Sequence, residues 1–139
     1  MSNQVFKVSV QDYLDLYSFA VDLHKDSGDP IPKMNSKTIK TVNYILDIPF
    51  QSNFGKSAYV GFYKKASILF YLMIKNHPLE NGNKRLACMV LGLFYEKNNR
   101  FFKITNSKLY DLSTFVAKMD SLTMPKNIDE IVKTLKKYE

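Results

Sequence analysis

A chain of 139 residues that is 45% hydrophobic, with ten Phe and nine Tyr, is long enough for one core and too apolar to be disordered. The net charge of +7 favours anionic partners such as nucleotide phosphates. The basic residues come at most in pairs, however, so we do not expect a nucleic acid to be the partner. Charged residues interrupt every apolar run before the ~18 residues that a membrane span needs, and a lone cysteine suits a reduced compartment. We therefore expect a single cytoplasmic domain over residues 1–139 that makes no contact with a membrane.

The helical spacing of apolar residues predicts a series of helices along the whole chain. Their expected bounds are Gln11–His24, Ser36–Leu46, Tyr59–Asn76, Asn83–Lys97, Ser107–Asp120 and Asn127–Tyr138. Ser9 is the expected N-cap of the first helix. The second half of the third helix is apolar on nearly every face, which predicts that the other helices surround it. The pattern therefore indicates an all-α fold, a compact bundle of about six helices.

The segment between the second and third predicted helices is short, polar and turn-like. It runs Phe50-Gln51-Ser52-Asn53-Phe54-Gly55-Lys56 and contains two aromatic residues. This composition predicts a loop or a short hairpin immediately before the central helix.

The loop between the third and fourth predicted helices carries an unusual concentration of polar residues. It runs His77-Pro78-Leu79-Glu80-Asn81-Gly82-Asn83-Lys84-Arg85 and joins two strongly apolar helices, so its polar groups emerge from the core. Gly82 permits a positive φ, which turns successive backbone N–H groups toward one point and forms an anion nest. The helix that follows adds free N–H groups, and Lys84 and Arg85 add charge. A phosphate is the ligand that suits such a loop best.

His77 is the natural proton acceptor in this loop, because an imidazole titrates at a pKa of about 6.5, close to neutral pH. Placed against a substrate hydroxyl, it would act as a general base. Cys88, by contrast, lies in the apolar run that follows and is interpreted as a small hydrophobic residue.

The loop resembles the motif of the Fic/Doc family, in which His77, Pro78, Gly82, Asn83, Lys84 and Arg85 match in order. The resemblance extends from about Ile45 to Asn99, and Lys before the final Arg is typical of the Doc (death-on-curing) branch. It implies the Fic fold, with His77 as the general base, Gly82 and Asn83 in a phosphate nest, and Arg85 holding a nucleotide phosphate and stabilising charge during transfer. It also implies that a flap aligns the target segment by strand-like pairing, and the expected flap residues are Gln51, Ser52, Asn53, Phe54 and Gly55.

Lys84 indicates the subtype within the family. Doc-like proteins with this Lys are associated with ATP, Mg²⁺ and transfer of the terminal phosphate, so the resemblance implies a toxin kinase that modifies elongation factor Tu. The second Arg of AMP-transferring members is replaced by Cys88. The helix of self-inhibited members, with its Glu, has no counterpart in the chain, so we expect a separate antitoxin as partner.

Two residues depart from the family motif. Leu79 stands in place of Phe, which is tolerable if that side chain only anchors the loop in the core. Asn81 stands where an acidic residue binds Mg²⁺; its carbonyl is a weaker ligand, and the adjacent Glu80 is the possible substitute. Two alternatives to the kinase therefore remain open: AMP transfer to a protein hydroxyl, and an inactive scaffold that binds a protein or a nucleic acid.

Overall fold

The computed structural model describes residues 4–76, 78–79 and 82–139. Within these residues the chain forms six α-helices, two short 3-10 helices and one hairpin. The helices are α1 (Val10–His24), α2 (Ser36–Asp47), α3 (Phe62–Lys75), α4 (Asn83–Lys97), α5 (Asn106–Ala117) and α6 (Met124–Lys137), the 3-10 helices are η1 (Ile48–Phe50) and η2 (Ser121–Thr123), and the hairpin pairs β1 (Ser52–Asn53) with β2 (Lys56–Ser57). The prediction of an all-α bundle is confirmed.

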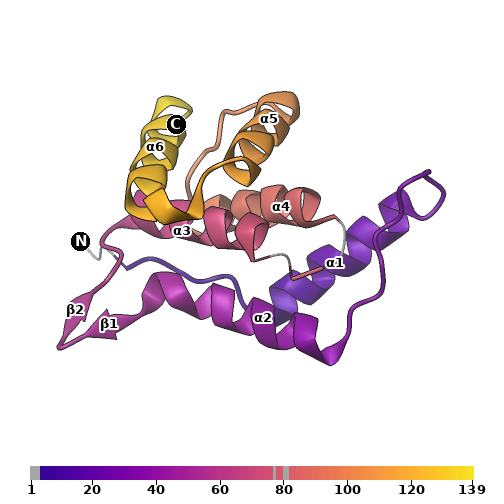
Figure 1. Cartoon of the computed structure of the whole chain (residues 1–139), viewed down its shortest axis with the longest axis horizontal. Helices are drawn as coiled ribbons and strands as arrows, with labels where there is room; N and C mark the ends of the chain where they lie inside the picture. The colour runs from indigo at the N-terminus through magenta and orange to yellow at the C-terminus, as the bar shows by residue number, and fades with distance from the viewer. Residues whose placement is uncertain (1–3, 77, 80–81) are drawn as a thin grey trace.

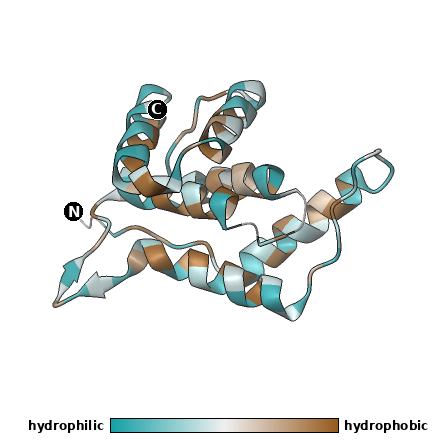
Figure 2. Ribbon diagram, in the orientation of Figure 1, coloured by the Kyte–Doolittle hydropathy of each residue, from teal (hydrophilic) through white to brown (hydrophobic). Residues whose placement is uncertain are grey.

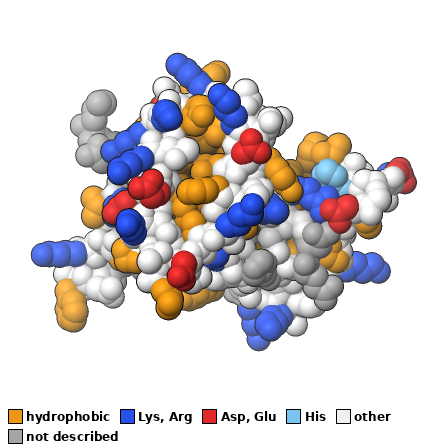
Figure 3. Space-filling view, turned by 45° about the horizontal axis from the view of Figure 1, so that its top comes forward, with side chains coloured by type: hydrophobic (Ala, Val, Ile, Leu, Met, Phe, Trp, Pro, Cys, Tyr) orange, Lys and Arg blue, Asp and Glu red, His pale blue; other side chains and the backbone are white. Residues whose placement is uncertain are grey.

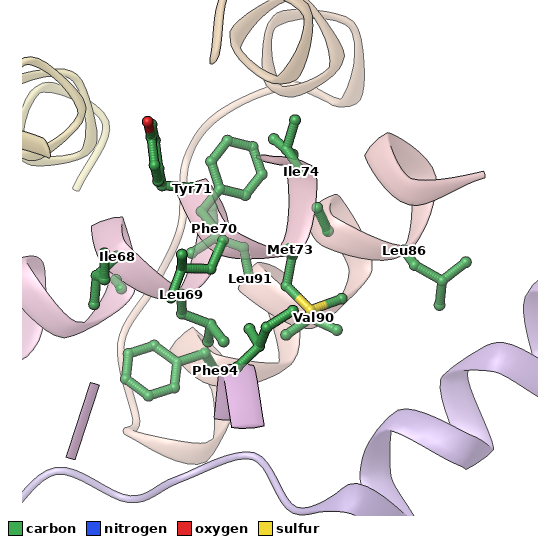
Figure 4. Close-up of a cluster of buried hydrophobic side chains, with 14 of the residues drawn as sticks. Ile68, Leu69, Phe70, Tyr71, Met73, Ile74, Leu86, Val90, Leu91 and Phe94 are labelled. Carbon is green, nitrogen blue, oxygen red and sulfur yellow. The ribbon is translucent and has the colours of Figure 1, made fainter. Parts of the chain in front are cut away.

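Helix α3 lies at the centre of the bundle, as its sequence predicts (Figure 1). Eleven of its fourteen residues are buried, and it packs against α2, α4, α5 and α6. Side chains from α3 and α4, among them Met73, Val90 and Phe94, interlock in the core (Figure 4). Phe62, at the start of α3, stacks on Phe94 with ring centroids 5.0 Å apart. The core therefore fixes both ends of α3 relative to α4.

The outer helices are amphipathic and turn their apolar sides toward this centre (Figure 2). Two of them begin with a capping box, which satisfies free backbone N–H groups at their first turns. Ser9 caps α1 together with Asp12, and Asn35 caps α2 together with Thr38. The prediction that Ser9 is the N-cap of the first helix is therefore confirmed.

Two helix starts differ from the predictions by three residues. Helix α3 begins at Phe62 rather than Tyr59, because Gly61 has φ +86° and serves as its N-cap. Helix α6 begins at Met124 rather than Asn127, because Pro125 fits the first turn of a helix, where its missing N–H costs nothing. None of the described helices is both long enough and apolar enough to cross a membrane.

Candidate functional site

Gly82 forms the turn that joins the polar loop to α4. Its φ of +86° and ψ of +7° are left-handed, as the sequence predicts, and it serves as the N-cap of α4. A Cβ atom at this position would lie 3.1 Å from Cγ1 of Ile31, a buried residue of the α1–α2 connection. The backbone angle therefore favours glycine here, and any larger residue would also have to displace the Ile31 side chain.

The first turn of α4 presents backbone N–H groups that meet no acceptor in the part of the chain that the structure describes. Gly82 supplies no side-chain cap, and the first helical hydrogen bond runs from the N–H of Leu86 to the carbonyl of Gly82 at 3.0 Å. Among the described residues, the N–H groups of Asn83, Lys84 and Arg85 therefore have no partner. Free N–H groups and the positive end of the helix dipole favour an anion at this point.

The side chain of Asn83 links the first turn of α4 to Leu79. Its Oδ1 accepts a hydrogen bond from the N–H of Leu79 at 2.9 Å, and its Nδ2 donates to the carbonyl of Leu79 at 2.8 Å. Asn83 is only 8% exposed, and Leu79 is buried in the core, as expected of the residue that anchors the loop. Both polar atoms of the Asn83 side chain thus bond to Leu79, so the side chain positions this loop residue, and the backbone N–H of Asn83 lies at the start of the helix.

Arg85 lies against the same turn. Its Nη2 is 3.4 Å from the position of a Cβ atom on Gly82 and 3.4 Å from Oδ2 of Asp29, while its Nη1 donates to the carbonyl of Asp29 at 3.0 Å. The structure therefore brings Gly82, the N-terminus of α4 and the Arg85 guanidinium to one place. This arrangement of donors is of the kind that suits a phosphate-sized anion.

Lys84 points to the other side of the loop. Its Nζ lies 5.4 Å from the centroid of the Tyr110 ring, on α5. A cation over an aromatic face is stabilised there, so the ammonium is directed away from Asp29 and Arg85. The structure thus separates Lys84 from Arg85, although the two are adjacent in the sequence.

Three expected site residues, His77, Glu80 and Asn81, lie outside the described residues. A cavity of about 450 Å³ lies beside the loop, between Pro78 and Leu79 on one side and the start of α2 on the other. Lys33 and Lys37 line this cavity. It is a polar, basic space next to the segment that contains His77.

Comparison with known families gives one match. The Fic/DOC family matches residues 7–95, which include the loop, α3 and nearly all of α4. The chain belongs to the Fic/DOC family. No curated protein and no solved structure matches it. Proteins of this family generally transfer nucleotide-derived groups to proteins with the help of ATP and metal ions, which supports a protein transferase or a related role.

The flap that the Fic/DOC resemblance predicts at Gln51–Gly55 coincides with the hairpin. Ser52 pairs with Ser57, and the turn is made by Phe54 and Gly55, whose φ angles of +53° and +77° are typical of tight hairpin turns. The hairpin is exposed, and the Phe54 side chain is fully open to solvent. It lies at the opposite end of α3 from the polar loop (Figure 1). The structure therefore does not bring the hairpin and the loop together.

Sequence reasoning missed two residues that lie against the candidate site, Asp29 and Ile31. Both lie in the α1–α2 connection, where the run of Asp, Ser, Gly and Pro indicates only a turn. Asp29 and Arg85 are 56 positions apart, so no local pattern predicts their contact. The available signal was the apolar residue Ile31 within an otherwise polar connection, and the structure shows that this residue is buried.

The charged surface of this Fic/DOC protein does not form a continuous basic patch on the face shown in Figure 3. Its Lys and Arg side chains are scattered among neutral and acidic ones. Among the described residues, no three His, Cys, Asp or Glu side chains are placed to hold a metal ion.

Proposed function

We propose that the chain is a Doc-type toxin kinase that transfers the ATP γ-phosphate to a hydroxyl of a translation protein such as elongation factor Tu. The observation that carries this proposal is the convergence of the left-handed turn at Gly82, the free N–H groups of α4 and the guanidinium of Arg85. This arrangement suits a phosphate, and the Lys84-Arg85 pair in the motif favours the Doc branch over AMP-transferring members.

In the proposed reaction, the oxygen of the target hydroxyl attacks the γ-phosphorus, the bond to the β-phosphate oxygen breaks, and ADP leaves. His77 takes the proton of the hydroxyl. Arg85 and the N–H groups of α4 stabilise the negative charge that spreads over the phosphoryl oxygens. Asn81 and Glu80 would hold the Mg²⁺ ion, which shields phosphate charge when bound.

Arg85 must exchange partners for this chemistry. In the structure its guanidinium binds both the carbonyl and the carboxylate of Asp29. The Asp29 side chain is 71% exposed, so the ion pair is screened by water and contributes little stability. A nucleotide phosphate, which carries more charge and also meets the α4 N–H groups, would displace the Asp29 carboxylate from Arg85.

AMP transfer is the second candidate function. It is favoured by the position of Lys84, whose ammonium lies over Tyr110 and not beside Arg85. If the side chain keeps this position with ATP bound, Lys84 does not act on the phosphates beside Arg85, and the feature that favours the kinase over AMP transfer is lost.

Labelled ATP with a cell extract distinguishes these functions. Label that reaches protein from the γ-phosphate indicates a kinase, and label from the α-phosphate indicates AMP transfer. His77→Ala and Arg85→Gln are expected to abolish either transfer, whereas Lys40→Gln, which removes an exposed charge from α2, is expected to leave it unchanged. No transfer from either position would leave the scaffold alternative, for which Asn81 would be the explanation.

The toxin part of the proposal has its own test. We place the protein in the cytoplasm, where ATP and the translation machinery are available, and we expect a separate antitoxin to restrain it. Induction of the chain alone should stop growth, and induction of His77→Ala should not. Normal growth with an active wild-type chain would contradict the toxin role but not the transferase.

A further inference from the structure

The cavity between the polar loop and the start of α2 has two walls that are held by hydrogen bonds. Leu79 belongs to one wall, and both of its backbone polar groups bind the first turn of α4. The other wall contains Asn35 and Thr38, which form the capping box of α2. Leu79 and Thr38 are buried, whereas Lys33 and Lys37 are exposed at the edge of the cavity. With a volume of about 450 Å³, the cavity has the size of a small ligand-binding cleft.

The charge around this cavity has one sign only. Among the described residues that line it, two are lysines, none is acidic, and the others are polar or apolar: Lys33, Asn35, Lys37, Thr38, Thr41, Asn76, Pro78 and Leu79. Residues 30–46 contain three lysines and no acidic residue. Within the described part of the chain, neither Lys33 nor Lys37 forms an ion pair. Both ammonium groups are therefore available to an anionic group that enters the cavity.

Lys37 opposes the electrostatic preference of the helix that carries it. Acidic side chains stabilise the first turn of a helix and cations destabilise it, because the helix dipole is positive there. Lys37 lies in the first turn of α2, which contains no acidic residue. A charge that works against the local preference is typical of a residue that serves binding and not stability. The contacts on offer come from the lysine side chains, since the Asn35 capping box occupies the end of the helix.

We propose that this cavity selects the protein substrate through an acidic residue near the target hydroxyl, whose carboxylate binds Lys33 and Lys37. The inference rests on the proposed transferase function, because the cavity adjoins Pro78 and so the segment that contains His77, the proposed base. It uses none of the donors at the N-terminus of α4, so the nucleotide phosphates and the substrate carboxylate have separate partners. The attraction between exposed opposite charges weakens as salt is added.

Two blocked peptides that differ only in charge test the proposal. Acetyl-Ala-Glu-Ser-Glu-Ala-amide carries a carboxylate on each side of a hydroxyl, and its counterpart carries Gln in place of both Glu residues. The full chain is titrated with each peptide without ATP, and amide shifts in two-dimensional NMR are the readout. The acidic peptide is expected to shift residues 33–41 and to bind about fivefold more tightly than the Gln peptide. Added salt should remove most of this preference.

A double variant assigns the preference to the two lysines. Lys33→Gln with Lys37→Gln should lower the affinity for the acidic peptide to that for the Gln peptide. The matched control is Lys133→Gln with Lys137→Gln, which removes the same charge at the same spacing from exposed positions of α6, across α3 from α2 (Figure 1). The control should keep the preference of the wild type. All four lysines are exposed, so neither double variant removes a buried contact.

Three results of these titrations would overturn the proposal. They are equal binding of the two peptides to the wild-type chain, a preference that survives in the Lys33→Gln, Lys37→Gln chain, and displacement of the acidic peptide from residues 33–41 by ATP. The last result would assign the cavity to the nucleotide.

Labelled ATP with the same two peptides separates this inference from the proposed function. Faster transfer to the acidic peptide, lost in the Lys33→Gln, Lys37→Gln chain, would support both. A binding preference without transfer to either peptide would support the site for an acidic segment and contradict the transferase. Transfer at equal rates to both peptides would support the transferase and overturn the selection by charge.

Discussion

The side chain of Asn83 binds both backbone polar groups of Leu79, one through each of its amide atoms. The hydrogen bonds are 2.9 and 2.8 Å long and buried, so they are shielded from competition by water. They fix Leu79 to the first residue of α4. The geometry of the anion site thus depends on a side chain that need not touch the anion.

Replacing Asn83 is expected to cost stability as well as activity. Asn83→Ala leaves the N–H and carbonyl of Leu79 without partners in a buried position, at a cost of about 2–3 kcal/mol in the free energy of unfolding. Urea denaturation measures this loss. Asn76→Ala, an exposed position directly before the loop, should change the free energy by less than about 0.5 kcal/mol. Equal effects of the two substitutions would contradict the role assigned to Asn83.

Gly82 should tolerate no side chain. Gly82→Ala forces a residue with a Cβ into the left-handed region and against Ile31, and we expect a loss of about 1–3 kcal/mol together with weaker nucleotide binding. Gly92→Ala is the control, since that glycine lies within α4 with open space around it, and alanine there should be neutral or stabilising by up to about 1 kcal/mol. Thermal unfolding of the two variants checks both signs.

Removing the Asp29 carboxylate should strengthen nucleotide binding. Asp29→Asn takes away the anion that pairs with Arg85, and we expect ATP to bind about two- to fivefold more tightly with little change in stability. Asp26→Asn removes the same charge from a neighbouring exposed position of the same connection, so it controls for the change in net charge. Calorimetric titration with ATP is the measurement. A weaker affinity in Asp29→Asn would instead show that Asp29 holds Arg85 in its binding position.

Cys88 should react slowly while the chain is folded. Burial raises the pKa of its thiol to about 11, so at pH 8 the thiolate is about a hundredfold scarcer than for a thiol of ordinary pKa. The rate of alkylation by iodoacetamide should keep rising from pH 8 to pH 10 in the folded chain. In urea the rate should level off toward pH 10, because an exposed thiol has a pKa of about 8.5. The same levelling-off in the folded chain would contradict the burial of the thiol.

Restoring the acidic residue of the family motif should improve metal-dependent activity. Asn81→Asp supplies a carboxylate in place of a neutral amide, and the Mg²⁺ concentration for half-maximal transfer is expected to fall about tenfold. Glu80→Gln tests the substitute ligand: a large loss of Mg²⁺ affinity would assign that role to Glu80. Transfer rates measured against Mg²⁺ concentration separate these outcomes.

Local signals in the sequence were sufficient for the parts of the site that depend on the neighbouring residues. The bounds of α4 and the positive φ of Gly82 follow from an apolar repeat and a glycine placed before it, and both are confirmed. The contact between Asp29 and Arg85 was not predictable, because it depends on how the α1–α2 connection crosses the loop. The direction of Lys84 was missed for the same reason, since Tyr110 belongs to a helix that follows later in the chain.

Because α3 is buried, the distance between its two ends is fixed. With eleven of fourteen residues enclosed by four other helices, neither end can shift without disturbing a close-packed core. A helix of fourteen residues is about 21 Å long, the span of roughly six residues of extended peptide. A target strand that pairs with the hairpin and offers its hydroxyl to the loop would have to contain about that many residues between the two points. Helix α3 would then set the distance between the two contacts. A substrate would be selected by the number of residues between its paired strand and its hydroxyl, as well as by its side-chain chemistry.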